Sequence, residues 1–174
     1  SLGGSLIVPE KINIKFLDGF VKTLRKQYRN YKFVIICGGG TIARKYISAL
    51  KKEKRSKKEL AEAGIRATRM NALFMMQMFG KEANDSLPLN MKEINSNLAK
   101  NSIVICGALR YEDNATSDTT AAKLAHYLNT DFVNITNVDG LYTDNPKTHK
   151  NAKFVPNISW KRFEKLALSI KFKE

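Results

Sequence analysis

The segment FVIICGGGTIARKY, residues 33–46, constrains the fold more than any other part of the chain. It begins with a short apolar run rich in β-branched residues, which is typical of a strand buried on both faces. Three consecutive glycines, Gly38–Gly40, follow directly, and a basic segment that suits a helix comes next. The pattern therefore predicts a buried strand, then a turn whose backbone approaches another group closely, then a helix.

The same alternation of short apolar strands and helical segments continues along the chain. We expect strands at Phe33–Cys37, Ile103–Cys106 and Phe132–Thr136, and the tail of a first strand at Ser1–Gly4. We expect helices at Lys15–Tyr28, Ile42–Leu50, Glu59–Gly80, Thr119–Leu128 and Ile158–Ile170, with Ser159 as the N-cap of the last one. The methionine-rich stripe on the long helix, from Met70 to Met78, is expected in the core or at a subunit interface. The alternation predicts an α/β fold with a central, mainly parallel sheet.

The composition is that of a folded protein. The 174 residues are 43% hydrophobic and 26% charged, which suits a single domain spanning residues 1–174. No apolar run approaches the roughly 20 residues that cross a bilayer. Cys37 and Cys106 each end a predicted strand, and we expect reduced core thiols rather than a disulfide. These features favour a cytoplasmic location without a membrane partner.

The chain carries a strong positive charge. Thirty lysines and arginines face 16 acidic residues, which gives a net charge of +14. Such a charge attracts polyanions, and much of it lies in the run KKEKRSKKE, residues 51–59. Interleaved aromatic residues and RNA-binding signatures are missing from the sequence. We therefore expect a solvated lysine-rich face and no nucleic-acid partner.

The three glycines are placed where a phosphate group binds in an α/β protein. Ligands of such folds collect at the carboxyl ends of the strands, where the next helix presents free N–H groups and a partial positive charge. Gly38–Gly40 lie between a strand and a helix, and Arg44 follows one turn later. The pattern is neither a Walker loop nor GxGxxG, so a purely structural tight turn is the alternative.

Three further segments suit the same chemistry. Gly3–Ser5 also follow a strand end, and two glycine-rich loops would serve a phosphoryl donor and an acceptor. Thr116–Asp118 place two hydroxyls and a carboxylate at a helix start, where Asp118 is either an N-cap or a group that organises the transferring phosphates. Thr136–Thr143 end a strand in polar residues and an aromatic ring, which suits a base and a ribose. The alternative for this last segment is a β-turn on its Asp-Gly pair.

In order, these segments resemble the amino-acid kinase superfamily, and more closely its archaeal-type uridylate kinases. The matching stretches are SLGGSLIVPE, CGGGTIARKYI, GIRATRMNA, TSDTTAAKLA and ITNVDGLYTDNPKTHKNAKFVPNISW. The resemblance implies a three-layer αβα fold. It also implies transfer of the γ-phosphate of ATP, bound with Mg²⁺, to UMP, which gives UDP for pyrimidine nucleotide biosynthesis. A homohexamer is implied as well.

The resemblance assigns roles to individual positions. The residues expected at ATP are Gly4, Ser5, Gly40, Arg44, Thr136, Asn137, Tyr142 and Asn145. Those expected at UMP are Gly39, Ala61, Asn114, Ala115, Thr116 and Ser117. Asp118 and Arg44 are expected to be catalytic. Mg²⁺ is expected to arrive with ATP, and no protein residue is assigned to it.

The chain also departs from this family. Ser1 stands where many superfamily kinases have a phosphate-binding lysine, and Ala61 stands where the family has an aspartate that contacts UMP. The loop 109–115 is longer than the family's, and Asn145 replaces an aspartate. Family members continue beyond Glu174, so we expect a domain truncated at both ends, without its C-terminal part. Two alternatives stay open: a kinase of this fold with another acceptor, such as isopentenyl phosphate or a carboxylate, and a non-catalytic nucleotide-binding relative.

Overall fold

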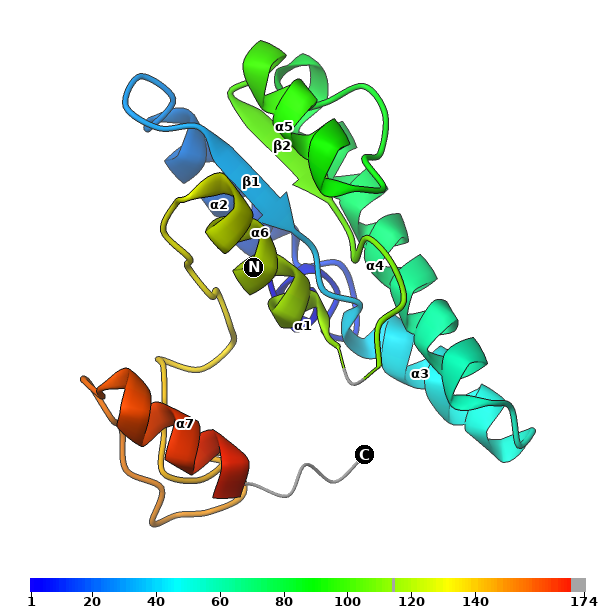
Figure 1. The fold of residues 1–174 in the computed structure, drawn as a ribbon, viewed down its shortest axis with the longest axis vertical. Coiled ribbons are helices and arrows are strands. Elements are labelled where there is room, and N and C mark those ends of the chain that lie inside the picture. Colours follow the sequence, from blue (N-terminus) through cyan, green and yellow to red (C-terminus); the bar gives the residue numbers. More distant parts are fainter. Residues whose placement is uncertain (114, 170–174) are drawn as a thin grey trace. The chain divides into compact units, whose positions relative to one another are not determined.

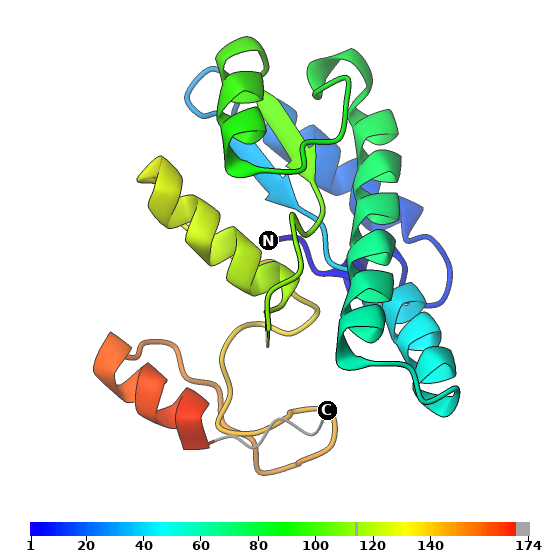
Figure 2. The ribbon, with the colours of Figure 1, turned by 45° about the vertical axis from the view of Figure 1, so that its right-hand side comes forward.

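The computed structural model describes residues 1–113 and 115–169 (Figures 1 and 2). The chain divides into two compact units, Ser1–Asn137 and Val138–Glu174. Each unit is described by itself below. In the described part of the chain, no helix is both long enough and apolar enough to cross a bilayer.

A parallel sheet forms the centre of the first unit. Strand β1 (Phe33–Ile36) pairs with β2 (Ile103–Cys106), and Phe33 lies opposite Ile103. On the other side of β1, Leu2 forms parallel bridges to Cys37 and to Ile135. The spatial order is therefore β2, β1, Leu2, Ile135. The expected strands at Phe33–Cys37 and Ile103–Cys106 are confirmed. The expected strand tail at Ser1–Gly4 is confirmed only at Leu2, because Gly4 already begins α1.

The predicted strand Phe132–Thr136 is wrong in extent, because only Ile135 is bridged. The Ile135 N–H donates to the Ser1 carbonyl at 2.9 Å, and the Ile135 carbonyl accepts from the Gly3 N–H at 2.9 Å. The Ser1 amino group also donates to the Val133 carbonyl at 2.7 Å, but Val133 is 65% exposed and is not part of a strand. An apolar, β-branched composition favours a strand but does not determine how many of its residues are paired.

Side chains alternate between two hydrophobic clusters on opposite faces of the strands. Ile35, Ile103 and Ile105 pack in one cluster with α2 (Ile14–Arg25) and α4 (Lys57–Phe79). Ile36, Val104 and Cys106 pack in the other with α5 (Met91–Lys100) and α6 (Ser117–Leu128). Figures 1 and 2 show α4 and α6 on opposite sides of β1 and β2. The sheet is thus covered on both faces, which confirms the three-layer α/β fold.

The helices begin where capping residues stand in the sequence. Ser56 and Glu59 form a reciprocal capping box at the start of α4, while Asn13 and Asn90 cap α2 and α5. The expected helices are confirmed, with shifted ends, as α2, α3 (Gly40–Lys52), α4, α6 and α7 (Trp160–Ser169). The four-residue α1 (Gly4–Ile7) and α5 are not among the predicted helices.

The methionine-rich stripe of α4 divides between core and surface. Met75 and Met76 are buried in the cluster around Ile35, whereas Met70 is 63% exposed. The core assignment is therefore confirmed for part of the stripe. Met70 and its neighbour Leu73 form an exposed apolar stretch on this helix.

Both cysteines are free thiols, as expected, and both are buried. The Cys37 N–H donates to the Cys106 carbonyl at 2.8 Å, which extends the pairing of β1 and β2 by one residue. Burial raises the pKa of Cys106 to about 12. Burial also raises the pKa of Cys37, with a smaller contribution from the nearby Cys106.

The second unit contains a short antiparallel contact and α7. Tyr142 and Phe154 form an antiparallel bridge, and their rings meet edge to face with centroids 5.5 Å apart. At the start of α7, the Arg162 N–H donates to Ser159 Oγ at 3.4 Å. The expected capping role of Ser159 is therefore confirmed.

Candidate active site

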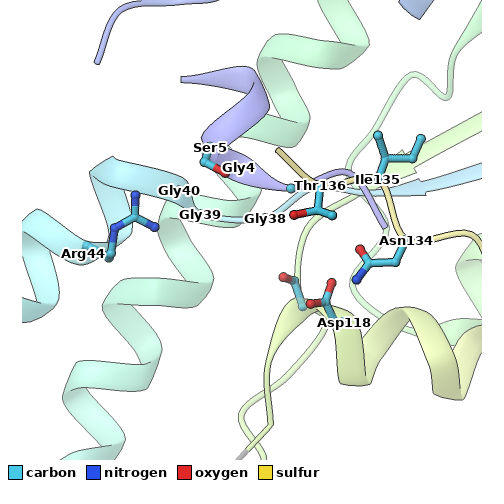
Figure 3. Close-up of a pocket in the computed structure, with 12 residues that line it drawn as sticks. Gly4, Ser5, Gly38, Gly39, Gly40, Arg44, Asp118, Asn134, Ile135 and Thr136 are labelled. Carbon is cyan, nitrogen blue, oxygen red and sulfur yellow. The ribbon is translucent and has the colours of Figure 1, made fainter. Parts of the chain in front are cut away.

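A pocket of about 200 Å³ lies in the first unit at the carboxyl ends of the parallel strands (Figure 3). Its lining residues are Gly3, Gly4, Ser5, Gly38, Gly39, Gly40, Arg44, Ser117, Asp118, Asn134, Ile135 and Thr136. They come from the exits of three neighbouring strand positions and from the first turns of α1, α3 and α6. This edge of a parallel sheet is where α/β proteins bind their ligands.

The two glycine-rich loops pack directly against each other. A Cβ atom on Gly4 would lie 2.2 Å from the Gly40 nitrogen, and one on Gly38 would lie 2.6 Å from the Gly4 nitrogen. Gly40 also has a φ of +59°, which disfavours residues with a side chain. The glycines therefore serve a structural purpose, the close approach of two loops. That approach also brings their backbone to the wall of the pocket.

The start of α3 presents backbone N–H groups and one guanidinium to the pocket. Gly39 is the N-cap and has no side chain to accept from the first-turn N–H groups. Arg44 Nη2 donates to Thr41 Oγ1 at 3.0 Å, and Thr41 Oγ1 donates to the Pro9 carbonyl. Thr41 thus holds the Arg44 side chain beside the glycine loop. A helix N-terminus with an adjacent arginine is a favourable site for a phosphate group.

The start of α6 contributes a hydroxyl and a carboxylate. Thr116 is the N-cap, because its Oγ1 accepts from the Thr119 N–H at 3.3 Å. Asp118 is therefore not the N-cap, and that alternative is wrong. The Asp118 carboxylate lines the pocket and accepts a hydrogen bond from Ser1 Oγ at 2.6 Å. Arg44 and Asp118 reach the pocket from different helices (Figure 3).

The loop before α6 carries a charged cluster and lines a second pocket of about 330 Å³. Hydrogen bonds from Lys123, and then from Arg110, lower the pKa of Glu112 in this loop. Ala115 lines this second pocket, together with residues of α5 and α6. It does not line the glycine-loop pocket.

Eight of the assigned residues line the glycine-loop pocket. They are Gly4, Ser5, Gly39, Gly40, Arg44, Ser117, Asp118 and Thr136. Two further residues, Thr116 and Asn137, are next to lining residues in the sequence but do not line the pocket. Ala61 lies on α4 outside the pocket. Asn114 is outside the described residues. Tyr142 and Asn145 belong to the second unit, where the Tyr142 hydroxyl donates to Asp139 Oδ2 at 3.4 Å. The division into ATP and UMP ligands stays a prediction.

Four lining residues are not among the assigned ones. Gly3 and Gly38 belong to the two glycine-rich segments that the sequence predicts at phosphates, but the resemblance assigns neither of them to ATP or UMP. Asn134 and Ile135 precede Thr136, and their alternating polar and apolar character matches a strand end that borders a polar site. The single bridge at Ile135 explains why this position is hard to recognise in the sequence.

Comparisons with known proteins find a matching family model, similar sequences and a similar fold. A family model described as the amino acid kinase family matches residues 1–172. A uridylate kinase from Thermococcus sibiricus is 32% identical over 168 residues, which cover 96% of this chain and 74% of that protein. One from Thermoplasma volcanium is 38% identical over 154 residues, 88% of this chain and 66% of that protein. The crystal structure of uridylate kinase from Archaeoglobus fulgidus superposes with a TM-score of 0.81 at 29% identity, covering 95% of this chain and 74% of that one.

Proposed function

We propose that this chain, which belongs to the amino acid kinase family, transfers the γ-phosphate of ATP to UMP. The observation that carries the proposal is the pair of interlocked glycine loops, with Arg44 and Asp118 at the same pocket. The chain is also about a third identical to uridylate kinases along nearly its whole length. The product is UDP, and the reaction belongs to pyrimidine nucleotide synthesis.

The pocket supplies what phosphoryl transfer needs, which is positioning and neutralisation of charge. The first turn of α3 offers backbone N–H groups at the wall of the pocket, next to the Gly38–Gly40 loop. Arg44 adds a guanidinium that can pair with two phosphate oxygens. Since these groups are already held by the fold, little rearrangement is required when negative charge shifts during transfer.

Asp118 is proposed to organise the polar groups around the transferring phosphate. Its carboxylate sits in the first turn of α6, where the helix dipole stabilises negative charge. Ser117 lies beside it in the same pocket and offers a hydroxyl to the acceptor. Ser117 and Asp118 thus place a hydroxyl and a carboxylate at the start of α6, across the pocket from the glycine loops.

Mg²⁺ is proposed to enter with ATP. In the described residues no group of three or more His, Cys, Asp or Glu side chains is placed to hold a metal ion. Asp118 supplies one carboxylate in the pocket, and Mg²⁺ commonly binds through one or two carboxylates, phosphate oxygens and water. When bound, the ion would neutralise charge on the transferring phosphoryl group.

The remaining assignments are part of the same proposal. Thr136 lines the pocket, and Asn137, Tyr142 and Asn145 follow it in the sequence as further ATP ligands. The net charge of +14 favours the capture of two anionic nucleotides. A cytoplasmic homohexamer is proposed by analogy with the family.

The test is a panel of acceptors with the full-length gene product that carries this chain. ATP and Mg²⁺ are incubated with UMP, CMP, dUMP or isopentenyl phosphate, and ADP is measured. We expect turnover selective for UMP. Turnover with another acceptor would assign a different kinase of this fold, a result that the substitution at Ala61 would then explain. A folded protein that binds ATP without turnover would be a non-catalytic relative.

A further inference from the structure

One turn of α4, Thr68–Asn71, touches both loops that leave the two central strands. Thr68 and Asn71 are 6% and 3% exposed, and they are polar residues within an otherwise apolar buried face. This turn belongs to the stretch GIRATRMNA, to which no ligand has been assigned here. Buried polar side chains must be hydrogen-bonded, so their partners show what they hold in place.

Asn71 holds the glycine loop that leaves β1. Its Nδ2 donates to the Gly38 carbonyl at 2.7 Å, and this hydrogen bond is buried. The Gly38 N–H donates in the opposite direction, to the Leu2 carbonyl at 2.9 Å. The Gly38 peptide is therefore fixed between the neighbouring strand and α4. A Cβ on Gly38 would lie 2.6 Å from the Gly4 nitrogen, so the Gly4 backbone also packs closely against Gly38.

Thr68 and Arg69 hold the loop that leaves β2. Thr68 Oγ1 accepts from the Ala108 N–H at 2.8 Å and donates to the Ile65 carbonyl at 2.7 Å. Arg69 Nε donates to the Ala108 carbonyl at 3.2 Å, and Arg69 Nη2 donates to the Leu109 carbonyl. A Cβ on Gly107 would lie 2.7 Å from the Arg69 nitrogen, so the strand end lies directly against the helix.

The two sets of contacts meet at Thr68. A Cβ built on Gly39 would lie 3.5 Å from Thr68 Cγ2, while the hydroxyl of the same residue binds the other loop. Gly39 lines the pocket, and the chain that leaves Ala108 leads to Ser117 and Asp118 on its other side. One helical turn therefore contacts both the glycine loop, which forms one wall of the pocket, and the β2 exit loop, whose chain continues to α6.

We propose that Thr68, Arg69 and Asn71 are positioning residues that set the spacing between the glycine loop and the β2 exit loop. This inference rests on the proposed function, because the spacing matters for bringing the donor phosphate in line with the acceptor. Displacement of a reacting group by about 1 Å can lower a rate about 100-fold. The three residues need not touch either nucleotide to have this effect.

Asn84 provides a matched control. It is also 3% exposed, and its side chain pairs with the backbone of β2, accepting from the Ile105 N–H at 2.6 Å and donating to the Ile105 carbonyl at 3.1 Å. It supports the same strand in its middle rather than at its exit. Loss of the Asn84 amide should lower the free energy of unfolding about as much as loss of the Asn71 amide, without moving the glycine loop or the β2 exit loop.

The experiment compares Asn71→Ala with Asn84→Ala, and Thr68→Val with Thr68→Ser, in the full-length protein. We expect Asn71→Ala to lower kcat about 10- to 100-fold with a smaller change in KM. Asn84→Ala should lower the melting temperature similarly and keep kcat within about threefold. Thr68→Val, which is nearly isosteric, should lower kcat. Thr68→Ser keeps the hydroxyl and should therefore keep most of the wild-type kcat.

Hydrogen–deuterium exchange on the same proteins gives a measure that does not need turnover. Asn71→Ala should speed exchange of the amides in residues 38–42, whereas Asn84→Ala should not. Equal kcat losses in Asn71→Ala and Asn84→Ala, or unchanged exchange in residues 38–42, would overturn the inference. A wild-type protein without UMP turnover would instead refute the proposed function, and the exchange result would still decide whether the turn holds the loop.

Discussion

The first turn of α6 divides two tasks between neighbouring residues. Thr116 Oγ1 accepts from the Thr119 N–H as the N-cap, while the Asp118 carboxylate lines the pocket. Its hydrogen bond to Ser1 Oγ places the carboxylate beside the backbone of the first strand position. The structure therefore places the Asp118 carboxylate in the pocket and leaves the capping of α6 to Thr116.

Replacing Asp118 by Asn should separate these tasks. We expect kcat to fall about 100-fold or more, because a charged group that orders the transferring phosphate is lost. UMP affinity, measured by calorimetry, should change far less. Thr116→Ala should behave differently and lower the free energy of unfolding by about 1 kcal/mol, as the loss of an N-cap does. An unchanged kcat in the Asp118→Asn protein would show that the Asp118 carboxylate takes no part in the transfer.

Replacing Arg44 by Ala should weaken nucleotide binding. A hydrogen bond to a charged group contributes about 1.5–3 kcal/mol, so we expect a loss of affinity of about 10- to 100-fold. Arg66→Ala is the matched control, since Arg66 lies exposed on α4 and pairs with Glu62 at 3.6 Å. Equal affinities of the Arg44→Ala protein and the wild type for ATP and for UMP would remove Arg44 from the site.

Two glycine-to-alanine changes should have opposite effects on stability. Gly4→Ala places a methyl group 2.2 Å from the Gly40 nitrogen, so we expect severe destabilisation and loss of the pocket. Gly19 lies in α2 with nothing within 4 Å of an added Cβ, so Gly19→Ala should stabilise by about 0.5–1 kcal/mol. Urea denaturation of both variants tests this, and a Gly4→Ala protein as stable as wild type would show that the loops can separate.

At the residue scale, the sequence identified several residues that line the pocket. Gly39, Gly40, Arg44 and Asp118 stand at strand exits and helix starts, which local patterns reveal. Asn71 was not identifiable in this way, because one asparagine in a helix is compatible with many surroundings. Its role depends on the Gly38 carbonyl, which is 33 residues away in the sequence.

At the scale of elements, the strand predictions were correct where the segment is buried on both faces of the sheet. Phe33–Cys37 and Ile103–Cys106 are short runs covered on both faces, and such runs have few alternatives to a central strand. Phe132–Thr136 has a similar composition, but only Ile135 has a bridging partner. The helix α5 was not predicted, although Asn90 is an ordinary N-cap and Met91, Ile94 and Leu98 follow helical spacing. The α5 segment MKEINSNLAK holds only three large apolar residues, which gives a weak periodic signal.

The two strand-end thiols should be unreactive in the folded protein. Burial raises the pKa of Cys106 to about 12, so a thiol reagent at pH 8 should label Cys37 and Cys106 only after denaturation. The unfolded thiol ionises near pH 9.0 and the folded Cys106 near 12, so the unfolded state binds fewer protons between these values. The free energy of unfolding should therefore fall as the pH rises through this window. Rapid labelling of Cys37 or Cys106 in the native protein at pH 8 would contradict the expectation that both thiols are unreactive.

At the scale of the whole molecule, the fold was more predictable than the details of the site. The alternation of strands and helices and the order of the motifs identified the layered α/β arrangement. The contacts that join the loops, such as those between Gly4 and Gly40, arise only when segments distant in sequence come together. The excess of positive charge belongs to this scale as well, because it acts on anionic ligands through the field of the whole chain.

The most direct test follows the phosphate itself. The full-length protein is incubated with ATP, Mg²⁺ and UMP, and ³¹P NMR records the nucleotide products over time. We predict that UDP and ADP appear in equal amounts, and that the Asp118→Asn protein slows both together. ADP that forms without UDP would indicate hydrolysis, and the absence of both products from a folded protein would contradict the assignment of this pocket to UMP phosphorylation.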